Sequence, residues 1–163
     1  MDERAFTGIA EEYAARLYAV AFRLLGHRAD AEDAVQRALL KAFAARASYS
    51  PRWAVSTWLY RILSNVCIDE LRRRRPDVDA LPGPGERPPR SLTVRGRSAE
   101  HLDLERALAT VPPEARVLLA LHYVDGLSYR ELGVIRGISV NTVKSQLARG
   151  KSILREALRR GNE

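Results

Sequence analysis

Apolar residues recur at helical spacing over most of the sequence. Between residues 30 and 46 they fall at i, i+3, i+4 and i+7, the spacing of one face of an amphipathic helix: Ala31, Ala34, Val35, Ala38, Leu39 and Ala42. The same period runs through residues 13–26 and 57–75, and nothing there alternates for long enough to form a strand. The first 75 residues are therefore predicted to be entirely helical.

Residues that start or stop helices separate these segments. Gly26 is a typical C-terminal stop, and Asp30 is expected to cap the helix that follows it. Pro51 interrupts the periodicity, and Ser56 is then expected to cap the segment 57–75.

One stretch has no hydrophobic period. Residues 75–98 contain five prolines and three glycines, and that density breaks helices and strands alike. We predict a flexible linker over 76–98, with one domain before it (1–75) and a second after it (99–163).

The second domain is also predicted to be helical. Ser98 is expected to cap its first helix, Pro113 suits the first turn of the next, and Asp125-Gly126 forms a turn. The predicted fold class is therefore all-α, with two small helical domains joined by a flexible linker.

The end of the chain has the pattern of a helix-turn-helix. Ser128 and Glu131 form a capping box that opens a short helix. Gly133 is a small residue where two helices would cross, and Gly137 lies in the turn before a long amphipathic helix.

This long helix has an apolar side and a basic side. At ~100° per residue, Val143, Leu147 and Gly150 share the apolar side. The other side carries small polar residues among cations: Asn141, Ser145, Ala148, Arg149 and Ser152, flanked by Lys144, Lys151 and Arg155. Residues 136–160 hold seven Lys or Arg and one Glu, a net charge of +6. A solvated face normally interleaves Glu at i, i+4, so the pattern favours a helix that enters the major groove of duplex DNA.

Aromatic and cationic residues lie close together in the sequence from residue 49 to residue 75. The aromatic members are Tyr49, Trp53, Trp58 and Tyr60, and the cations include Arg52, Arg61 and the run Arg72–Arg75. Such surfaces hold the unstacked bases and phosphates of single-stranded DNA. The same aromatic residues are equally suited to an ordinary core, so both interpretations stay open.

A third surface lies on the predicted helix over 30–46, opposite its apolar stripe. It consists of Asp33, Gln36, Arg37 and Leu40. An exposed leucine framed by an acid, an amide and a base resembles a small protein-docking face. An ordinary solvated helix face is an equal alternative.

The remaining composition argues against several classes of protein. Cys67 is the only cysteine, and His27, His101 and His122 lack ligand spacing, so no disulfide, metal or cofactor is expected. No nucleophile, base and orienting group come together, which argues against an enzyme. Without a signal peptide or an apolar run approaching ~20 residues, membrane insertion is not expected and the expected location is cytoplasmic.

Three stretches together resemble the extracytoplasmic-function (ECF) group of sigma-70 family RNA polymerase sigma factors. Residues 13–43 resemble the core of sigma region 2, residues 56–75 its promoter-melting segment, and residues 111–156 sigma region 4. The three in this order, with only a short linker between them, are typical of the ECF group.

The resemblance implies surfaces for core RNA polymerase and for promoter DNA. Asp33, Gln36, Arg37 and Leu40 would contact the clamp helices of the β′ subunit, and the β flap is a second implied contact. Residues implied at the non-template strand of the −10 element are Tyr49, Trp53, Trp58, Tyr60, Arg61, Asn65 and Arg72. Residues implied at the −35 duplex are Arg136, Asn141, Lys144, Ser145, Ala148, Arg149 and Ser152. A cognate anti-sigma factor is also implied.

Three positions depart from the family pattern. Arg37 stands where an acid is common, Trp53 replaces a small loop residue, and Arg136 occupies a usually apolar place. Arg136 is expected either to face solvent or to weaken the domain packing. The alternative function is a conventional helix-turn-helix transcriptional regulator in which residues 1–75 form a dimerisation domain.

Overall fold

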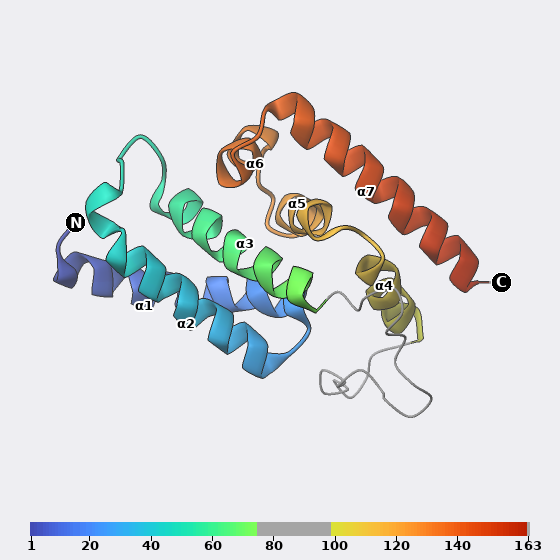
Figure 1. The fold of residues 1–163 in the computed structure, drawn as a ribbon, viewed down its shortest axis with the longest axis horizontal. Helices are drawn as coiled ribbons and strands as arrows, with labels where there is room; N and C mark the ends of the chain where they lie inside the picture. Colours follow the sequence, from blue (N-terminus) through green and yellow to red (C-terminus); the bar gives the residue numbers. More distant parts are fainter. Residues whose placement is uncertain (75–98, 163) are drawn as a thin grey trace.

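The computed structural model describes residues 1–74 and 99–162, and the regular structure of these residues is helical throughout (Figure 1). The elements are α1 (Glu3–Leu25), α2 (Arg28–Ala44), the 3₁₀ turn η1 (Arg46–Ser48), α3 (Val55–Arg73), α4 (Ala99–Ala109), α5 (Pro113–Tyr123), α6 (Tyr129–Arg136) and α7 (Val140–Gly161). The predicted all-α fold class is confirmed. The predicted linker over 76–98 and the expected cap at Ser98 lie outside the described residues.

Helices α1, α2 and α3 pack together through the apolar stripes seen in the sequence. Leu17 and Val20 of α1, Ala34 of α2, and Leu63 and Cys67 of α3 are each at most 1% exposed. A buried leucine or valine contributes roughly 1.5–3 kcal/mol relative to an exposed one. These stripes therefore hold the three helices together.

The start of α2 differs from the prediction, which placed the cap at Asp30. The helix already begins at Arg28, because the N–H of Ala31 donates to the carbonyl of His27 at 2.9 Å. Asp30 lies in the first turn, where a carboxylate favours the helix N-terminus. Its side chain forms an ion pair with Arg74 at the end of α3 instead of capping α2.

The predicted cap of α3 at Ser56 is also wrong. Ala54 holds the cap position, and its carbonyl accepts a hydrogen bond from the N–H of Trp58 at 3.2 Å. Because the backbone becomes helical at Val55, Ser56 lies inside the first turn and its hydroxyl caps nothing.

Helices α6 and α7 form the predicted helix-turn-helix. The hydroxyl of Ser128 accepts from the N–H of Glu131 at 3.1 Å, and the Glu131 carboxylate accepts from the N–H of Ser128 at 3.2 Å. Gly137 ends α6 with a φ of 67°, a conformation that L side chains rarely adopt. Pro113 occupies the first turn of α5, as predicted.

Gly133 leaves no room for a side chain where α6 meets the turn. A Cβ there would lie 2.8 Å from the carbonyl oxygen of Ile138. We expect Gly133→Ala to lower the free energy of unfolding by about 1–3 kcal/mol, because the backbone must shift to admit the methyl group. Urea unfolding followed by circular dichroism measures this change.

Gly8 of α1 is the matched control. A Cβ there would meet nothing within 4 Å, so Gly8→Ala should stabilise the chain by roughly 0.5–1 kcal/mol through helix propensity alone. Equal effects of the two substitutions would contradict the close approach at Gly133.

The helices before and after residues 75–98 lie in contact (Figure 1). Helix α5 packs against α1 and α3, and α6 packs against α3. Buried apolar residues from both parts form one continuous cluster. Three polar pairs also join the two parts: Arg23 with Asp125 at 2.9 Å, Arg72 with Glu114, and Arg136 with Asn65 at 2.9 Å. Part of the surface of α3 is therefore covered by α5 and α6.

Candidate nucleic-acid interface

Helix α7 has one side buried against α5 and one side open. Val143 and Leu147 are 0% and 3% exposed. A Cβ on Gly150 would lie 3.2 Å from Cδ1 of Leu119, so the two helices approach closely. The open side carries six residues that the resemblance places at the −35 duplex: Asn141, Lys144, Ser145, Ala148, Arg149 and Ser152.

The chemistry of this open side suits the edges of base pairs. Ser145 and Ala148 are too small to hold the helix away from a groove, and Arg149 presents a guanidinium that can donate two hydrogen bonds to guanine. Lys144 is exposed and carries an ammonium group, which is a common partner of phosphate. Within the described ranges, no hydrogen bond or ion pair engages the side chain of Arg149. Its donors are therefore available to a ligand.

Arg136 does not lie with this set. It ends α6, is half-buried, and donates from Nη1 to Oδ1 of Asn65 on α3 at 2.9 Å. Burial lowers the pKa of Arg136, and the neighbouring Arg72 and Arg61 lower it further. The sequence left two alternatives for Arg136, a solvent-facing side chain or a weakened domain packing, and in the structure the half-buried side chain reaches across to α3.

Tyr123 is a residue of this region that the sequence pattern did not identify. Its ring is 53% exposed at the end of α5, and the Lys151 ammonium lies 4.7 Å from the ring centroid. This cation–π contact orients Lys151, which the pattern placed beside the reading face. The sequence offered one indication of Tyr123, an aromatic residue close to the Asp125-Gly126 turn. Helical periodicity cannot predict its contact with Lys151, because the two residues belong to different helices.

The loop that leads into α3 carries a cluster of aromatic residues. The rings of Tyr49 and Trp58 lie 5.1 Å apart between centroids, and the Tyr49 hydroxyl donates to the carbonyl of Trp53 at 2.8 Å. Trp53 is 37% exposed. A rigid aromatic surface with one accessible indole is suited to stacking an unpaired base.

Tyr60 belongs to the core and not to this cluster. It is 4% exposed and shares one stripe of α3 with Leu63 and Cys67, at i, i+3 and i+7. Burial raises the pKa of its hydroxyl. Of the predicted −10 residues on α3, Arg61, Asn65 and Arg72 are exposed, whereas Tyr60 is buried.

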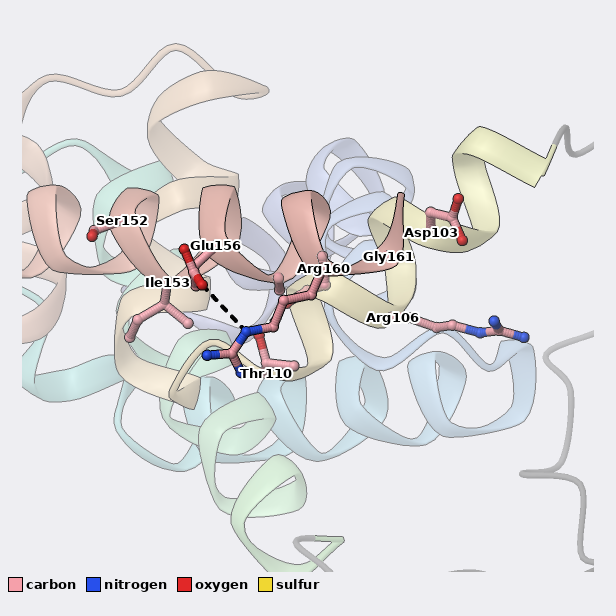
Figure 2. A pocket seen from close by; sticks show the side chains of 10 residues that line it. Asp103, Arg106, Thr110, Ser152, Ile153, Glu156, Arg160 and Gly161 are labelled. Atoms are coloured by element: carbon pink, nitrogen blue, oxygen red, sulfur yellow. Dashed lines mark hydrogen bonds and ion pairs between the residues drawn. The ribbon is translucent and has the colours of Figure 1, made fainter. Parts of the chain in front are cut away.

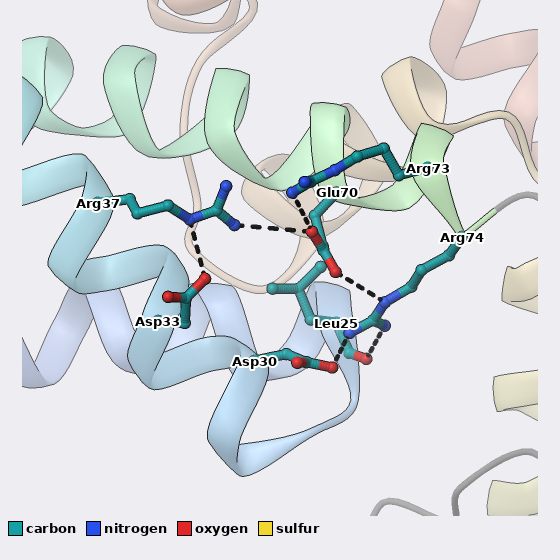
Figure 3. A network of polar contacts seen from close by, with 7 residues as sticks. All are labelled: Leu25, Asp30, Asp33, Arg37, Glu70, Arg73 and Arg74. Atoms are coloured by element: carbon teal, nitrogen blue, oxygen red, sulfur yellow. Dashed lines mark hydrogen bonds and ion pairs between the residues drawn. The ribbon is translucent and has the colours of Figure 1, made fainter.

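The open face of α2 presents three of its four predicted residues. Asp33 and Gln36 are exposed, and Leu40 is 69% exposed, more than any other large apolar side chain in the described ranges. Arg37 turns aside: its guanidinium forms ion pairs with Asp33 at 2.9 Å and with Glu70 of α3 at 3.6 Å (Figure 3). It therefore positions Asp33 and does not itself project from the face.

Glu70 is the centre of this ion-pair network (Figure 3). It also engages Arg73 of its own helix and Arg74, the residue that follows α3. Arg74 in turn pairs with Asp30 and donates to the carbonyl of Leu25 at 2.7 Å. The network ties the end of α3 to the corner between α1 and α2, and so holds the face of α2 in place.

Cys67 is completely buried, and burial raises the pKa of its thiol to about 12. We expect no reaction with a thiol reagent in the native protein at pH 8, and one reactive thiol after unfolding. The folded pKa lies above the ordinary value of 9.0, so the free energy of unfolding should be insensitive to this group below about pH 9 and fall as pH rises toward 12. Rapid labelling of the folded chain would contradict this burial.

Figure 2 shows a pocket between α4 and the C-terminal half of α7. Its lining mixes apolar and charged side chains, among them Ala107, Ile153 and Ala157 with Asp103, Arg106, Glu156 and Arg160. Glu156 pairs with Arg160 at 3.2 Å. Ser152 also lines this pocket, so it lies at the boundary between the reading face and α4.

Residues 1–74 and 99–162 were also searched for metal-ligand clusters and for membrane-spanning helices. In these ranges, no three His, Cys, Asp or Glu side chains gather as metal ligands would. No helix there is both long and apolar enough to cross a membrane.

Comparison with known proteins identifies the two parts of the fold. The model for Sigma-70 region 2 matches residues 9–76, and the model for Sigma-70, region 4 matches residues 101–154. The first match contains α2 and α3, and the second contains α6 and the part of α7 up to Leu154.

Several relatives and one solved structure match this chain over nearly its whole length. The ECF RNA polymerase sigma factor SigW of Bacillus subtilis is 33% identical, over 97% of this chain and 91% of its own length. SigE of Mycolicibacterium smegmatis is 36% identical over 92% of this chain, which spans 60% of that relative. The sigma factor RpoE of Bartonella quintana, solved in complex with the anti-sigma factor NepR, superposes with a TM-score of 0.68 at 27% identity, covering 96% of this chain and 98% of RpoE.

The chain belongs to the ECF sigma factors of the sigma-70 family. The alternative of a conventional regulator with an N-terminal dimerisation domain is not favoured, because region 2 occupies the residues assigned to dimerisation.

Proposed function

We propose that this chain binds core RNA polymerase and gives it promoter specificity, by reading a −35 duplex with α7 and holding the opened −10 strand on α3. The observation that carries the proposal is the open side of α7, where Arg149 and Lys144 stand among small polar residues on a helix fixed by its buried stripe. A solvated helix face would pair such cations with carboxylates.

Docking on polymerase is assigned to α2. Leu40 supplies an exposed apolar anchor, and Asp33 and Gln36 supply polar contacts around it. This composition suits the clamp helices of the β′ subunit, with an apolar centre and a polar rim. The mixed lining of the pocket between α4 and α7 suits a second polymerase contact, such as the β flap.

Melting is assigned to the aromatic loop and α3. Trp53 offers a ring to an unstacked base, and Arg61 and Arg72 offer charge to its phosphates. A protein that binds the opened strand better than the duplex shifts the equilibrium toward the open form. Docking both reading surfaces on one polymerase raises the effective concentration of each.

We further assign the chain a cognate anti-sigma factor and a cytoplasmic site of action. The anti-sigma factor is supported by the structural relative RpoE, which was solved with NepR. The cytoplasm is where core polymerase and promoter DNA meet.

Gel filtration and footprinting test the proposed function. The purified chain should co-elute with core polymerase, and the mixture should protect a −35 duplex and make thymines near −10 reactive to permanganate. Core polymerase alone and the chain alone are the controls. Separate elution, with no reactive thymine, would refute the proposed function.

A further inference from the structure

The loop between η1 and α3 forms an arch at the end where α3 begins (Figure 1). Its sequence, Ser50-Pro51-Arg52-Trp53, suits a tight turn, because serine favours the first position of such turns and proline the second. The N–H of Trp53 donates to the carbonyl of Ser50 at 3.3 Å and closes this turn. The N–H of Arg52 donates to the Ser50 hydroxyl at 3.4 Å. These bonds give the loop a defined shape.

Trp53 has both of its backbone groups bonded, and its indole is left open. Its N–H closes the turn, and its carbonyl accepts a hydrogen bond from the Tyr49 hydroxyl at 2.8 Å. Trp53 is 37% exposed, and within the described residues no ring contact or hydrogen bond engages the indole. The indole therefore stands on a fixed backbone, and its ring surface is available to a ligand.

Tyr49 links this loop to the core of the helices. Its ring lies 5.1 Å from the ring of Trp58 between centroids, at an interplanar angle of 50°. Trp58 is half-buried in α3 and packs against the buried apolar cluster. The N–H of Tyr49 also donates to the carbonyl of Arg46 at 3.4 Å. A hydrogen bond from a ring anchored in this way restricts Trp53 more than one from a freely rotating side chain would.

The hydroxyl of Tyr49 is already engaged within the protein. It carries one proton, and the Trp53 carbonyl receives it. A binding group that is fixed in advance loses less conformational entropy on binding than a mobile one. The geometry favours an indirect role for this hydroxyl, exerted through Trp53, over a hydrogen bond from it to a base.

We propose that Tyr49 is a positioning residue: its hydroxyl holds the backbone of Trp53 so that the indole stacks on one unpaired base of the −10 strand. This inference rests on the proposed function and deepens it. Because every base has a π-face, stacking accepts all four bases. The Tyr49 hydroxyl therefore adds affinity for the opened strand and does not set the base preference at that position.

A double-mutant cycle tests the link between Tyr49 and Trp53. Tyr49→Phe removes the hydroxyl and keeps the ring against Trp58, whereas Trp53→Leu removes the indole. Core polymerase with the full chain is titrated against a fluorescent single-stranded oligonucleotide that carries the −10 sequence obtained by promoter selection. Trp53→Leu should lower the affinity by about 5- to 150-fold, and Tyr49→Phe by about 2- to 12-fold. In the Trp53→Leu background, Tyr49→Phe should change the affinity by less than about twofold.

An abasic site moved along the oligonucleotide distinguishes positioning from a general loss of structure. At the position that stacks on Trp53, removal of the base should make the unmodified chain and both single variants bind within about twofold of one another. With any of the four bases at that position, Tyr49→Phe should cause the same loss.

Tyr18→Phe is the matched control. The ring of Tyr18 stacks on Phe22 of the same helix at 6.0 Å between centroids, and within the described residues no hydrogen bond engages its hydroxyl. This variant should bind the oligonucleotide as the unmodified chain does.

Several results would overturn the positioning role. They are unchanged affinity in Tyr49→Phe or in Trp53→Leu, an equal loss from Tyr49→Phe with and without the indole, and a loss that persists at every abasic position. A loss confined to one base would instead make Tyr49 a base-reading contact. If core polymerase with the unmodified chain does not bind the oligonucleotide at all, the proposed function itself fails.

Discussion

Replacing Leu40 by glutamate is expected to lower affinity for core RNA polymerase by at least about 30-fold. An apolar anchor at the centre of an interface contributes on the order of 2 kcal/mol or more, and a carboxylate in its place must also be desolvated. Leu40 is 69% exposed, so the substitution should change the free energy of unfolding by no more than about 0.5 kcal/mol. Fluorescence anisotropy of labelled chain titrated with core polymerase measures the loss.

Val124→Glu is the matched control for Leu40. Val124 is 58% exposed and lies after α5, away from the face of α2. Val124→Glu should leave the affinity for core polymerase within about twofold of that of the unmodified chain. If both variants bind as the unmodified chain does, α2 is not the docking face.

Replacing Arg149 by alanine is expected to remove about 1–3 kcal/mol of binding free energy at one base pair of the −35 element. This corresponds to a roughly 5- to 150-fold lower affinity for the preferred −35 sequence. The guanidinium stands on the open side of α7, and within the described ranges nothing pairs with it. Removing a bidentate contact should relax base preference at that position and leave the neighbouring positions unchanged. Selection from a library randomised around −35 measures the change.

Arg159 provides the control on the same helix. It is exposed, but both carboxylate oxygens of Glu156 accept from it at 3.0 Å. Arg159→Ala should therefore leave base preference unchanged. If Arg149→Ala weakens binding equally on every sequence and lowers the salt dependence by about one charge, Arg149 is a phosphate contact.

Local signals predicted the helices and the helix-turn-helix well. The period of Ala31, Ala34 and Ala38 was sufficient to place α2, and the capping box at Ser128 and Glu131 placed the start of α6. These features depend on residues within one or two turns of each other, so the sequence contains them directly.

Features that depend on distant residues were not predictable. Asp30 was expected to cap α2, but Arg74, 44 positions away, engages its carboxylate. Arg37 was assigned to a docking face, yet Glu70 of α3 attracts it. Tyr60 was predicted at the DNA surface because it is aromatic. In the structure it lies on the buried stripe of α3 and belongs to the core.

The contact of Arg136 with Asn65 shows the same limit for the candidate site. The two residues are 71 positions apart, and the family resemblance assigned each to a different DNA element. Only the packing of α6 on α3 brings them together. A pattern can therefore indicate which side chains are suited to DNA, but not which of them contact one another in the fold.

Transcription from a random promoter library, with and without this chain, tests the central claim most directly. Core RNA polymerase with the chain should initiate from a small set of promoters that share one −35 and one −10 sequence, and core polymerase alone should not. Arg149→Ala should alter the shared −35 sequence and leave the −10 sequence as it was. If no promoter fires, or if the active templates share no sequence at either element, the chain does not give polymerase its promoter choice.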